Sequence, residues 1–252
     1  MKTKLIILFL FFCVNFIKSQ DLLTGEIISN VYFLKYDAKK ASGFLIKYNG
    51  RSYLVTAKHF VDSLNSVPNS NGSKLKIEVF QDSKWNIFPG TVFFDENNDI
   101  DIACIRQNYI YLDTMTFGIT MEGLSYGEEG YFFGFPFGQG IPFNDGLKNS
   151  ALLPFVKKAL LSAFSFDKGI DKLFLDAMNN PGFSGGPIVF KNRNKKAPQK
   201  WNIVGVVSSY QNQNIEIKTK CDTLKIPLNS GILIGYGINH AMEIIKKNQN
   251  SP

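Results

Sequence analysis

The chain has 252 residues, of which 44% are hydrophobic and 14% aromatic, so it is long enough to bury a sizeable core. Beyond residues 1–20 it carries 25 Lys+Arg against 21 Asp+Glu, a mildly basic balance of +4. Arginine is rare, no stacking motif accompanies the basic run from Lys191 to Lys200, and that run is typical of an exposed loop. These observations argue against a nucleic-acid partner.

Residues 1–20 have the pattern of an export signal. Lys2 and Lys4 precede an almost wholly apolar stretch from Leu5 to Ile17, and Ser19 offers a small residue for cleavage. The apolar stretch has 13 residues, whereas a helix needs ~20 to span a bilayer. We therefore expect cleavage near Ser19, a secreted or periplasmic location, and no stable membrane insertion after cleavage.

The next part of the chain is rich in β-branched and aromatic residues, which predicts strands. Asn49-Gly50 between two such runs is a strong signal for a two-residue hairpin. The strands expected here cover 27–34, 42–48, 51–56, 75–80, 85–94 and 101–106.

A second group of short strands follows at regular spacing, which favours barrels or a sandwich. They are expected at 130–134, near 159–164, and at 172–176, 187–190, 203–208 and 232–239. Residues 240–248 place Ala241, Ile244 and Ile245 at helical spacing, which predicts a terminal helix.

A serine lies among three glycines and two prolines in the stretch 180–187, directly before an apolar run. Glycine permits positive φ and close approach of the backbone, so such a loop can expose Ser184 Oγ while its N–H groups converge on one point. A nucleophilic serine needs both features. A plain tight turn before a strand is the alternative.

The chain has two histidines, and His59 lies where an apolar strand pattern ends. Asp101 lies where the next strand pattern begins. Together with Ser184 these residues have the types required for a nucleophile, a base and an orienting acid. Asp99 is a competing acid, because residues two apart on a strand share a face.

The chain resembles the trypsin-like serine proteases over roughly residues 26–245. The motifs that carry the resemblance occur in the family's order: Thr56-Ala57-Lys58-His59, Asp101-Ile102-Ala103 and Gly182-Phe183-Ser184-Gly185-Gly186-Pro187. Residues 134–138 and 176–182 look like the bacterial HtrA-type and glutamyl-endopeptidase-like branch.

The resemblance implies an all-β chymotrypsin-like fold, with two six-stranded antiparallel barrels and a short C-terminal helix. After the signal at 1–20, the first barrel would occupy 21–115 and the second 116–252, with the crossover near Asp113. It also implies an exported serine endopeptidase that acts on proteins or peptides through His59, Asp101, Ser184 and an acyl-enzyme, without metal or cofactor. The oligomeric state is left open.

By the family pattern, the backbone N–H groups of Gly182 and Ser184 would form the oxyanion hole. The substrate-binding pocket would involve Met178, Asn179, Ser208, Ser209 and Tyr210. No acid or obvious cation lies among these residues, so an apolar or small residue is expected before the scissile bond.

Phe183 departs from the family, because digestive enzymes have an aspartate there that pairs with a freshly cut N-terminus. We therefore expect no zymogen switch of that kind, and an aromatic side chain leaves the resting state of the oxyanion loop open. HtrA-type proteins carry a PDZ domain after the protease, and none is expected before the chain ends at Pro252.

Two other function classes remain as alternatives. Read as a Gly-x-Ser-x-Gly elbow, residues 182–186 would belong to an α/β-hydrolase esterase that uses Asp222 and His240. That elbow needs a helix directly after Ser184, and Gly and Pro are poor helix residues. The other alternative is a protease-like binding protein with a closed oxyanion loop.

Cysteines and acids give no further site. Cys104 lies in an apolar strand, so a buried free thiol is the default, and nothing in the sequence pairs it with Cys221. Asp95, Asn97 and Asp99 begin like a calcium loop. Ile100 and Arg106 stand where such a loop needs glycine and its last ligand, so this interpretation fails.

Overall fold

The computed structural model describes residues 28–62, 70–107, 117–144, 150–194, 196–218 and 223–251. The proposed signal, Asp113, Cys221, Asp222 and the expected boundary at 115/116 lie outside these ranges. Within them, no helix is both long and apolar enough to cross a membrane.

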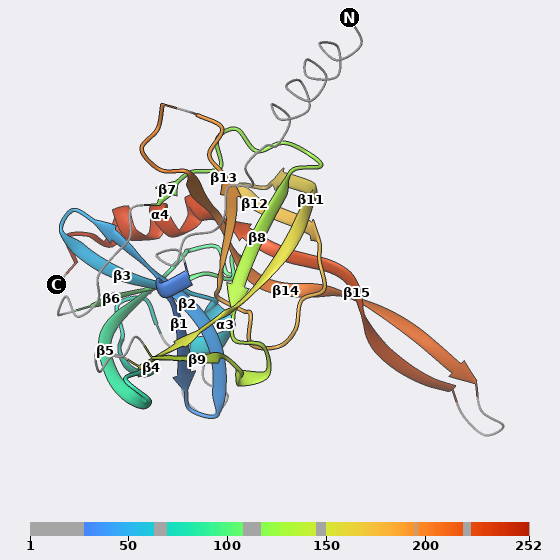
Figure 1. Ribbon diagram of the computed structural model, residues 1–252, viewed down its shortest axis with the longest axis horizontal. Helices are drawn as coiled ribbons and strands as arrows, with labels where there is room; N and C mark the ends of the chain where they lie inside the picture. Colours follow the sequence, from blue (N-terminus) through green and yellow to red (C-terminus); the bar gives the residue numbers. More distant parts are fainter. Residues whose placement is uncertain are drawn as a thin grey trace, which may run out of the picture.

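The first half of the chain forms a closed six-stranded antiparallel barrel with the strand order β1-β2-β3-β6-β5-β4 (Figure 1). Its strands are β1 (Val31–Tyr36), β2 (Lys39–Tyr48), β3 (Arg51–Thr56), β4 (Lys74–Gln81), β5 (Lys84–Phe94) and β6 (Ala103–Gln107). The Asn49-Gly50 turn joins β2 to β3, with positive φ at both residues, as predicted. Alternation is clear in β4, where Leu75, Ile77 and Val79 are buried.

The second half forms another barrel of six antiparallel strands. The sheet order is β13-β8-β11-β12-β15-β14, and an additional pairing of β13 with β14 closes the ring. Its strands are β8 (Glu129–Gly134), β11 (Phe155–Asp167), β12 (Ile170–Asp176), β13 (Pro187–Lys191), β14 (Trp201–Lys218) and β15 (Thr223–Gly237).

Three short strands were not predicted. β7 (Gly118–Ile119) joins the outer edge of β14 in parallel, and β9 (Ile141–Asn144) pairs with β10 (Ser150–Leu153) as a separate hairpin. At the N-terminal end, the strand expected from residue 27 begins only at Val31. The 3-10 turn η1 (Pro136–Gly138) follows β8 and contains Phe137 at φ 53°.

β14 and β15 continue past the barrel as a two-stranded ribbon that projects from the body (Figure 1). We call residues 211–218 and 223–230 the arm. The register places Ile215 opposite Ile226 and Ile217 opposite Leu224, so one face of the arm is apolar. The large side chains of that face are 40–51% exposed: Ile215, Ile217, Leu224, Ile226 and Leu228. β14 was expected to end at Ser208, but it continues to Lys218, so this prediction was wrong.

The C-terminal helix α4 (Ile238–Asn248) begins two residues earlier than predicted. It buries Ile238, Ala241, Ile244 and Ile245 in the cluster that also contains residues of the first barrel. Cys104 belongs to this cluster as a buried free thiol, with Sγ 3.7 Å from the carbonyl oxygen of Ala241. Burial raises the pKa of this thiol well above its usual range.

Candidate active site

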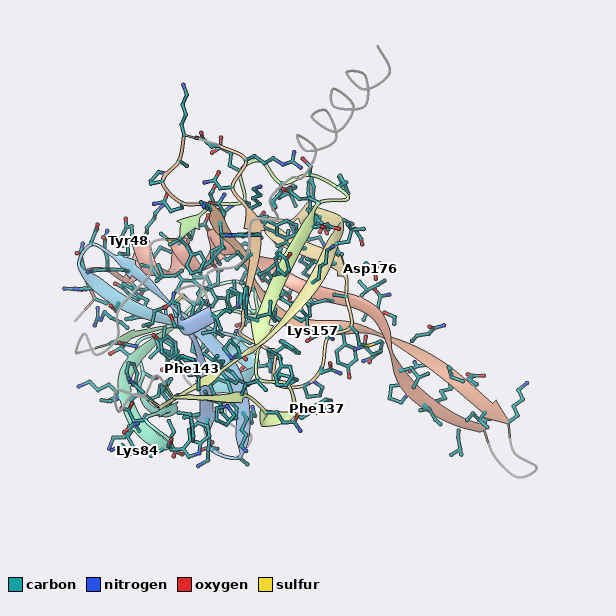
Figure 2. The ribbon with its side chains drawn as sticks, viewed as in Figure 1. Tyr48, Lys84, Phe137, Phe143, Lys157 and Asp176 are labelled. Atoms are coloured by element: carbon teal, nitrogen blue, oxygen red, sulfur yellow. The ribbon has the colours of Figure 1, made fainter. Side chains whose placement is uncertain are left out.

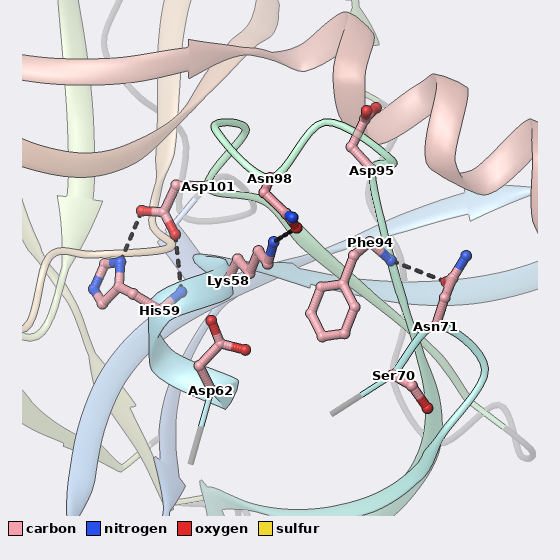
Figure 3. A pocket seen from close by; sticks show the side chains of 9 residues that line it. All are labelled: Lys58, His59, Asp62, Ser70, Asn71, Phe94, Asp95, Asn98 and Asp101. Carbon is pink, nitrogen blue, oxygen red and sulfur yellow. Dashed lines mark hydrogen bonds and ion pairs between the residues drawn. The ribbon is translucent and has the colours of Figure 1, made fainter. Parts of the chain in front are cut away.

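His59 and Asp101 meet at one end of the first barrel. His59 lies on the single turn α3 (Lys58–Val61) that follows β3, and Asp101 lies in the loop just before β6. His59 Nδ1 is 2.7 Å from Asp101 Oδ2, and the backbone N–H of His59 donates to Asp101 Oδ1 at 2.8 Å (Figure 3). Because a carboxylate accepts the Nδ1 proton, Nε2 keeps its lone pair and is available as a base.

Asp101 accepts a third hydrogen bond, from the Oγ of Ser208 at 2.5 Å. Its side chain is only 18% exposed. Burial by itself would raise the pKa of Asp101, but the hydrogen bonds and charge of His59, together with Ser208, outweigh burial and hold the pKa below the ordinary value. The carboxylate therefore stays ionised beside the imidazole.

This shift predicts how stability depends on pH. Because the pKa of Asp101 is lower in the folded chain, ionised Asp101 stabilises the fold above the unfolded pKa of about 3.9, and this contribution is lost as pH falls through the folded pKa. The difference in unfolding free energy between wild type and Asp101→Asn should therefore shrink on acidification from about pH 6 to pH 3. Urea unfolding across this range measures it, and a difference independent of pH would contradict the assignment.

Ser184 is brought to the same place by Ser208. The hydroxyl of Ser184 donates to the carbonyl oxygen of Ser208 at 2.9 Å, while Ser208 Oγ donates to Asp101. Ser208, on the second barrel, therefore contacts two predicted members of the triad, Asp101 and Ser184. No hydrogen bond joins Ser184 Oγ directly to His59 within the described residues; rotation about χ1 of Ser184 would redirect the hydroxyl.

The competing acid, Asp99, is exposed and does not contact His59. Asp95 Oδ1 accepts the N–H of Asn97 at 2.9 Å, and Asn97 Oδ1 accepts the N–H of Asp99 at 3.0 Å. The calcium-like spacing of these three residues is therefore explained by two successive Asx turns, which lead the chain to Asp101.

The loop that carries Ser184, residues 178–186, we call the nucleophile loop. Every carbonyl oxygen from 178 to 184 accepts a hydrogen bond from a fixed donor. In chain order the donors are Lys157 Nζ, Asn229 Nδ2, Phe183 N, Phe137 N, Ser42 Oγ, Gly186 N and Ser42 N. By contrast, the described residues provide no acceptor for the N–H of Gly182 or Ser184.

Two glycines of this loop have conformations that other residues rarely adopt. Gly182 has φ 105° and Gly185 has φ 83°. A Cβ on Gly182 would also collide with the carbonyl oxygen of Phe135, which explains glycine there. The predicted loop geometry therefore depends on glycine at these positions.

The side chain of Phe183 is fully buried. Its ring packs edge-on against Phe132, with centroids 4.9 Å apart, within the core of the second barrel. An aspartate at this position would be buried among these apolar groups. Burial of the aromatic ring thus anchors the loop to this core.

The structure brings together most of the residues predicted for the substrate pocket. Asn179 is 2% exposed, and its Nδ2 donates to the carbonyl oxygen of Ser209 at 3.1 Å. Ser208 contacts Ser184, as described, and Tyr210 follows on β14 beside a β-bulge. Met178 is 50% exposed. Their roles in recognition stay predictions.

His240 is part of a different environment. It is buried on α4, and its Nε2 accepts the backbone N–H of Asp171 at 2.9 Å. Potential ligand atoms of Asp95, His240 and Glu243 lie within 4.8 Å of one another. An imidazole that accepts at Nε2 carries its proton on Nδ1, so His240 has no lone pair left for a cation.

The α/β-hydrolase interpretation is wrong. Strand β13 follows Ser184 where that fold needs a helix, and the chain forms two antiparallel barrels. Its proposed acid, Asp222, lies outside the described residues.

Beside His59, a hollow of about 620 Å³ opens on the first barrel (Figure 3). It is lined by Lys58, His59, Asp62, Ser70, Asn71, Phe94, Asp95, Asn98 and Asp101. Lys58 Nζ donates to Asn98 Oδ1 at 2.9 Å across its wall. Polar groups thus surround the imidazole on this side.

Sequence reasoning missed the roles of four residues that hold the nucleophile loop: Ser42, Phe137, Lys157 and Asn229. Ser42 is fully buried in the first barrel, and its Oγ donates to Gly182 O at 2.7 Å and accepts from Phe135 N at 3.0 Å. Only Phe137 belongs to a stretch noted in the sequence, residues 134–138, and that stretch did not indicate this role. Their contacts depend on how the two barrels pack.

No model of a known protein family matches the sequence, and no curated protein matches it. Solved structures do match. Rv3671c from M. tuberculosis, as an inactive serine-to-alanine mutant, has a TM-score of 0.52 at 15% identity, covering 90% of each chain. A second inactive form of the Rv3671c protease has a TM-score of 0.51 at 15% identity, covering 88% of this chain and 89% of that one.

The HtrA-type protease AlgW, solved with a tripeptide, has a TM-score of 0.57 at 19% identity. The match covers 89% of this chain and 62% of the AlgW chain, which is less than two thirds. At such identities the likeness establishes the fold. It confirms the predicted chymotrypsin-like architecture of two barrels, with HtrA-type proteases among the structural neighbours.

Proposed function

We propose that the chain is a serine endopeptidase with the triad His59, Asp101 and Ser184. The observation that carries this proposal is that Ser208 contacts both parts of the triad: its Oγ donates to Asp101, which pairs with His59, and its backbone carbonyl oxygen accepts from Ser184 Oγ. These contacts bring residues of both barrels together. The HtrA-type protease among the structural neighbours supports the same class of reaction.

In the proposed mechanism, Ser184 Oγ attacks the carbonyl carbon of the scissile peptide bond while His59 Nε2 takes the hydroxyl proton. His59 then returns this proton to the leaving amine, which leaves an acyl-enzyme on Ser184. Water, deprotonated by His59, hydrolyses the ester. Asp101 fixes the imidazole tautomer and stabilises the imidazolium at each step.

The N–H groups of Gly182 and Ser184 would bind the oxyanion in the tetrahedral intermediates. Two observations support an open hole. These N–H groups have no acceptor among the described residues, and the carbonyl oxygen of Pro181 is held by Phe137 N at 2.7 Å. One well-placed donor is worth ~3 kcal/mol in acyl transfer.

The substrate proposed is a protein or peptide with an apolar or small residue before the scissile bond. Met178, Asn179, Ser208, Ser209 and Tyr210 would line the pocket. We also propose export, from the pattern of residues 1–20. Sequencing the N-terminus of the chain recovered outside the cytoplasm tests this: a start near residue 20 or 21 is expected, and an intact Met1 contradicts it.

Labelling with a serine-reactive fluorophosphonate tests the reaction class. Wild-type residues 21–252 should be labelled, Ser184→Ala and His59→Ala should not, and His240→Ala should label like wild type if it folds. Folding of each variant is checked by circular dichroism. A folded wild type that is not labelled would reject the enzyme and favour a binding protein, while labelling that survives in Ser184→Ala would reject this site.

A further inference from the structure

Lys157 lies near the start of β11 and is half-buried (Figure 2). Its ammonium donates to the carbonyl oxygen of Met178 and lies 3.5 Å from Asn180 Oδ1. It therefore contacts the loop on the side where the chain enters from β12, four to six residues before Ser184.

The same ammonium lies over two aromatic rings. Its nitrogen is 5.8 Å from the ring centroid of Phe183 and 5.8 Å from that of Phe132. These distances fall within the range of cation–π attraction. Phe183 directly precedes Ser184, so one ammonium contacts both the entry of the nucleophile loop and the residue beside the nucleophile.

The charge of Lys157 has no acidic partner in the part of the chain that the structure describes. Within the described residues it forms no ion pair, and its acceptors are a carbonyl, an amide and two ring faces. Burial lowers its pKa. The next residue is different: Lys158 is exposed and pairs with Glu129 at 2.6 Å. Lys157 is therefore a partly buried cation whose two hydrogen-bond acceptors both belong to the nucleophile loop, which points to a role in that loop.

We propose that Lys157 is a positioning residue that keeps the nucleophile loop in the arrangement where the N–H groups of Gly182 and Ser184 are unpaired. The inference rests on the proposed function. Lys157 is the one charged group among the seven donors that hold the loop's carbonyl oxygens. It ties Met178 and Phe183, which flank the Pro181–Gly182 peptide, to the same barrel strand. Without it, that peptide has more freedom to rotate.

The test compares Lys157→Met, Lys157→Arg and, as the matched control, Lys158→Met. Methionine keeps the length and apolar stem of the side chain, and arginine keeps the charge. The inactivation of residues 21–252 by a fluorophosphonate is followed over reagent concentration, which separates the maximal rate from the half-saturating concentration. Peptides with apolar and acidic residues before the cleaved bond are then compared for kcat and KM.

Lys157→Met should lower the maximal inactivation rate and kcat about 10- to 100-fold with little change in half-saturation or KM, since misplaced oxyanion donors affect the transition state. Lys157→Arg should recover much of this loss, and Lys158→Met should behave as wild type. Urea midpoints identify any variant that loses activity only because it is unfolded. If Lys157→Met is unfolded, the kinetics of Lys157→Arg decide the outcome.

Three results would overturn the inference: an unchanged maximal rate in folded Lys157→Met, an equal loss in Lys158→Met, or a loss confined to KM for acidic peptides. The last would make Lys157 a specificity residue. A wild type that is never labelled instead rejects the proposed function, so the two failures are distinguishable.

Discussion

Replacing Ser184 with alanine should lower kcat for peptide cleavage by about 10⁶-fold, and His59→Ala should cost about as much. The nucleophile and its base act as one unit, so the double variant should be no worse than either single variant. Neither side chain belongs to the core and His59 is 52% exposed, so both variants should fold, with His59→Ala losing only the stability that its pairing with Asp101 contributes. Steady-state cleavage and thermal unfolding measure the two effects.

The matched control is His240→Ala. His240 is buried and holds the N–H of Asp171, so this variant should lose stability and keep its turnover when folded. Turnover lost in His240→Ala but kept in His59→Ala would contradict the assignment of the base.

Replacing Phe183 with alanine should lower the free energy of unfolding by about 3–5 kcal/mol. The ring is fully buried against Phe132, so its loss removes apolar contact and leaves a cavity under the nucleophile loop. Urea denaturation measures the effect.

Phe137→Ala is the control for Phe183→Ala. Phe137 is also an aromatic residue beside the loop, but its side chain is 66% exposed and it holds Pro181 through its backbone N–H. It should cost under about 1 kcal/mol, as surface substitutions usually do. Equal losses in both variants would mean that burial of Phe183 does not anchor the loop.

The elements that could be predicted from the sequence are those with strong local signals. Asn49-Gly50 specified a hairpin, and enrichment in β-branched and aromatic residues predicted β4 and β5 to within a residue. The predicted His59 and Asp101 do meet, because each stands at a strand end of one closed barrel. Local sequence patterns were sufficient to predict a contact where the two residues lie next to strands that pair directly with each other in one sheet.

The remaining features depend on contacts that no local pattern encodes. Ser42 reaches Gly182, 140 residues away, only because the barrels pack together. β14 was expected to stop at Ser208, and the residues beyond it include Asn212 and Asn214, a type depleted in strands. Pairing with β15 overrides that preference along the arm.

The two parts of β14, inside the barrel and along the arm, differ in how readily their backbone hydrogen bonds open to solvent. From Trp201 to Ser208 the strand is buried within a closed ring, so its amides exchange with solvent only when the barrel opens. Beyond Tyr210 the ribbon has two strands and no core, and such a hairpin is marginal by itself. Its amides are therefore protected by little more than their own pairing, and this half of β14 opens locally while the barrel stays folded. The change from slow to fast opening falls at Ser208, Ser209 and Tyr210, beside the nucleophile.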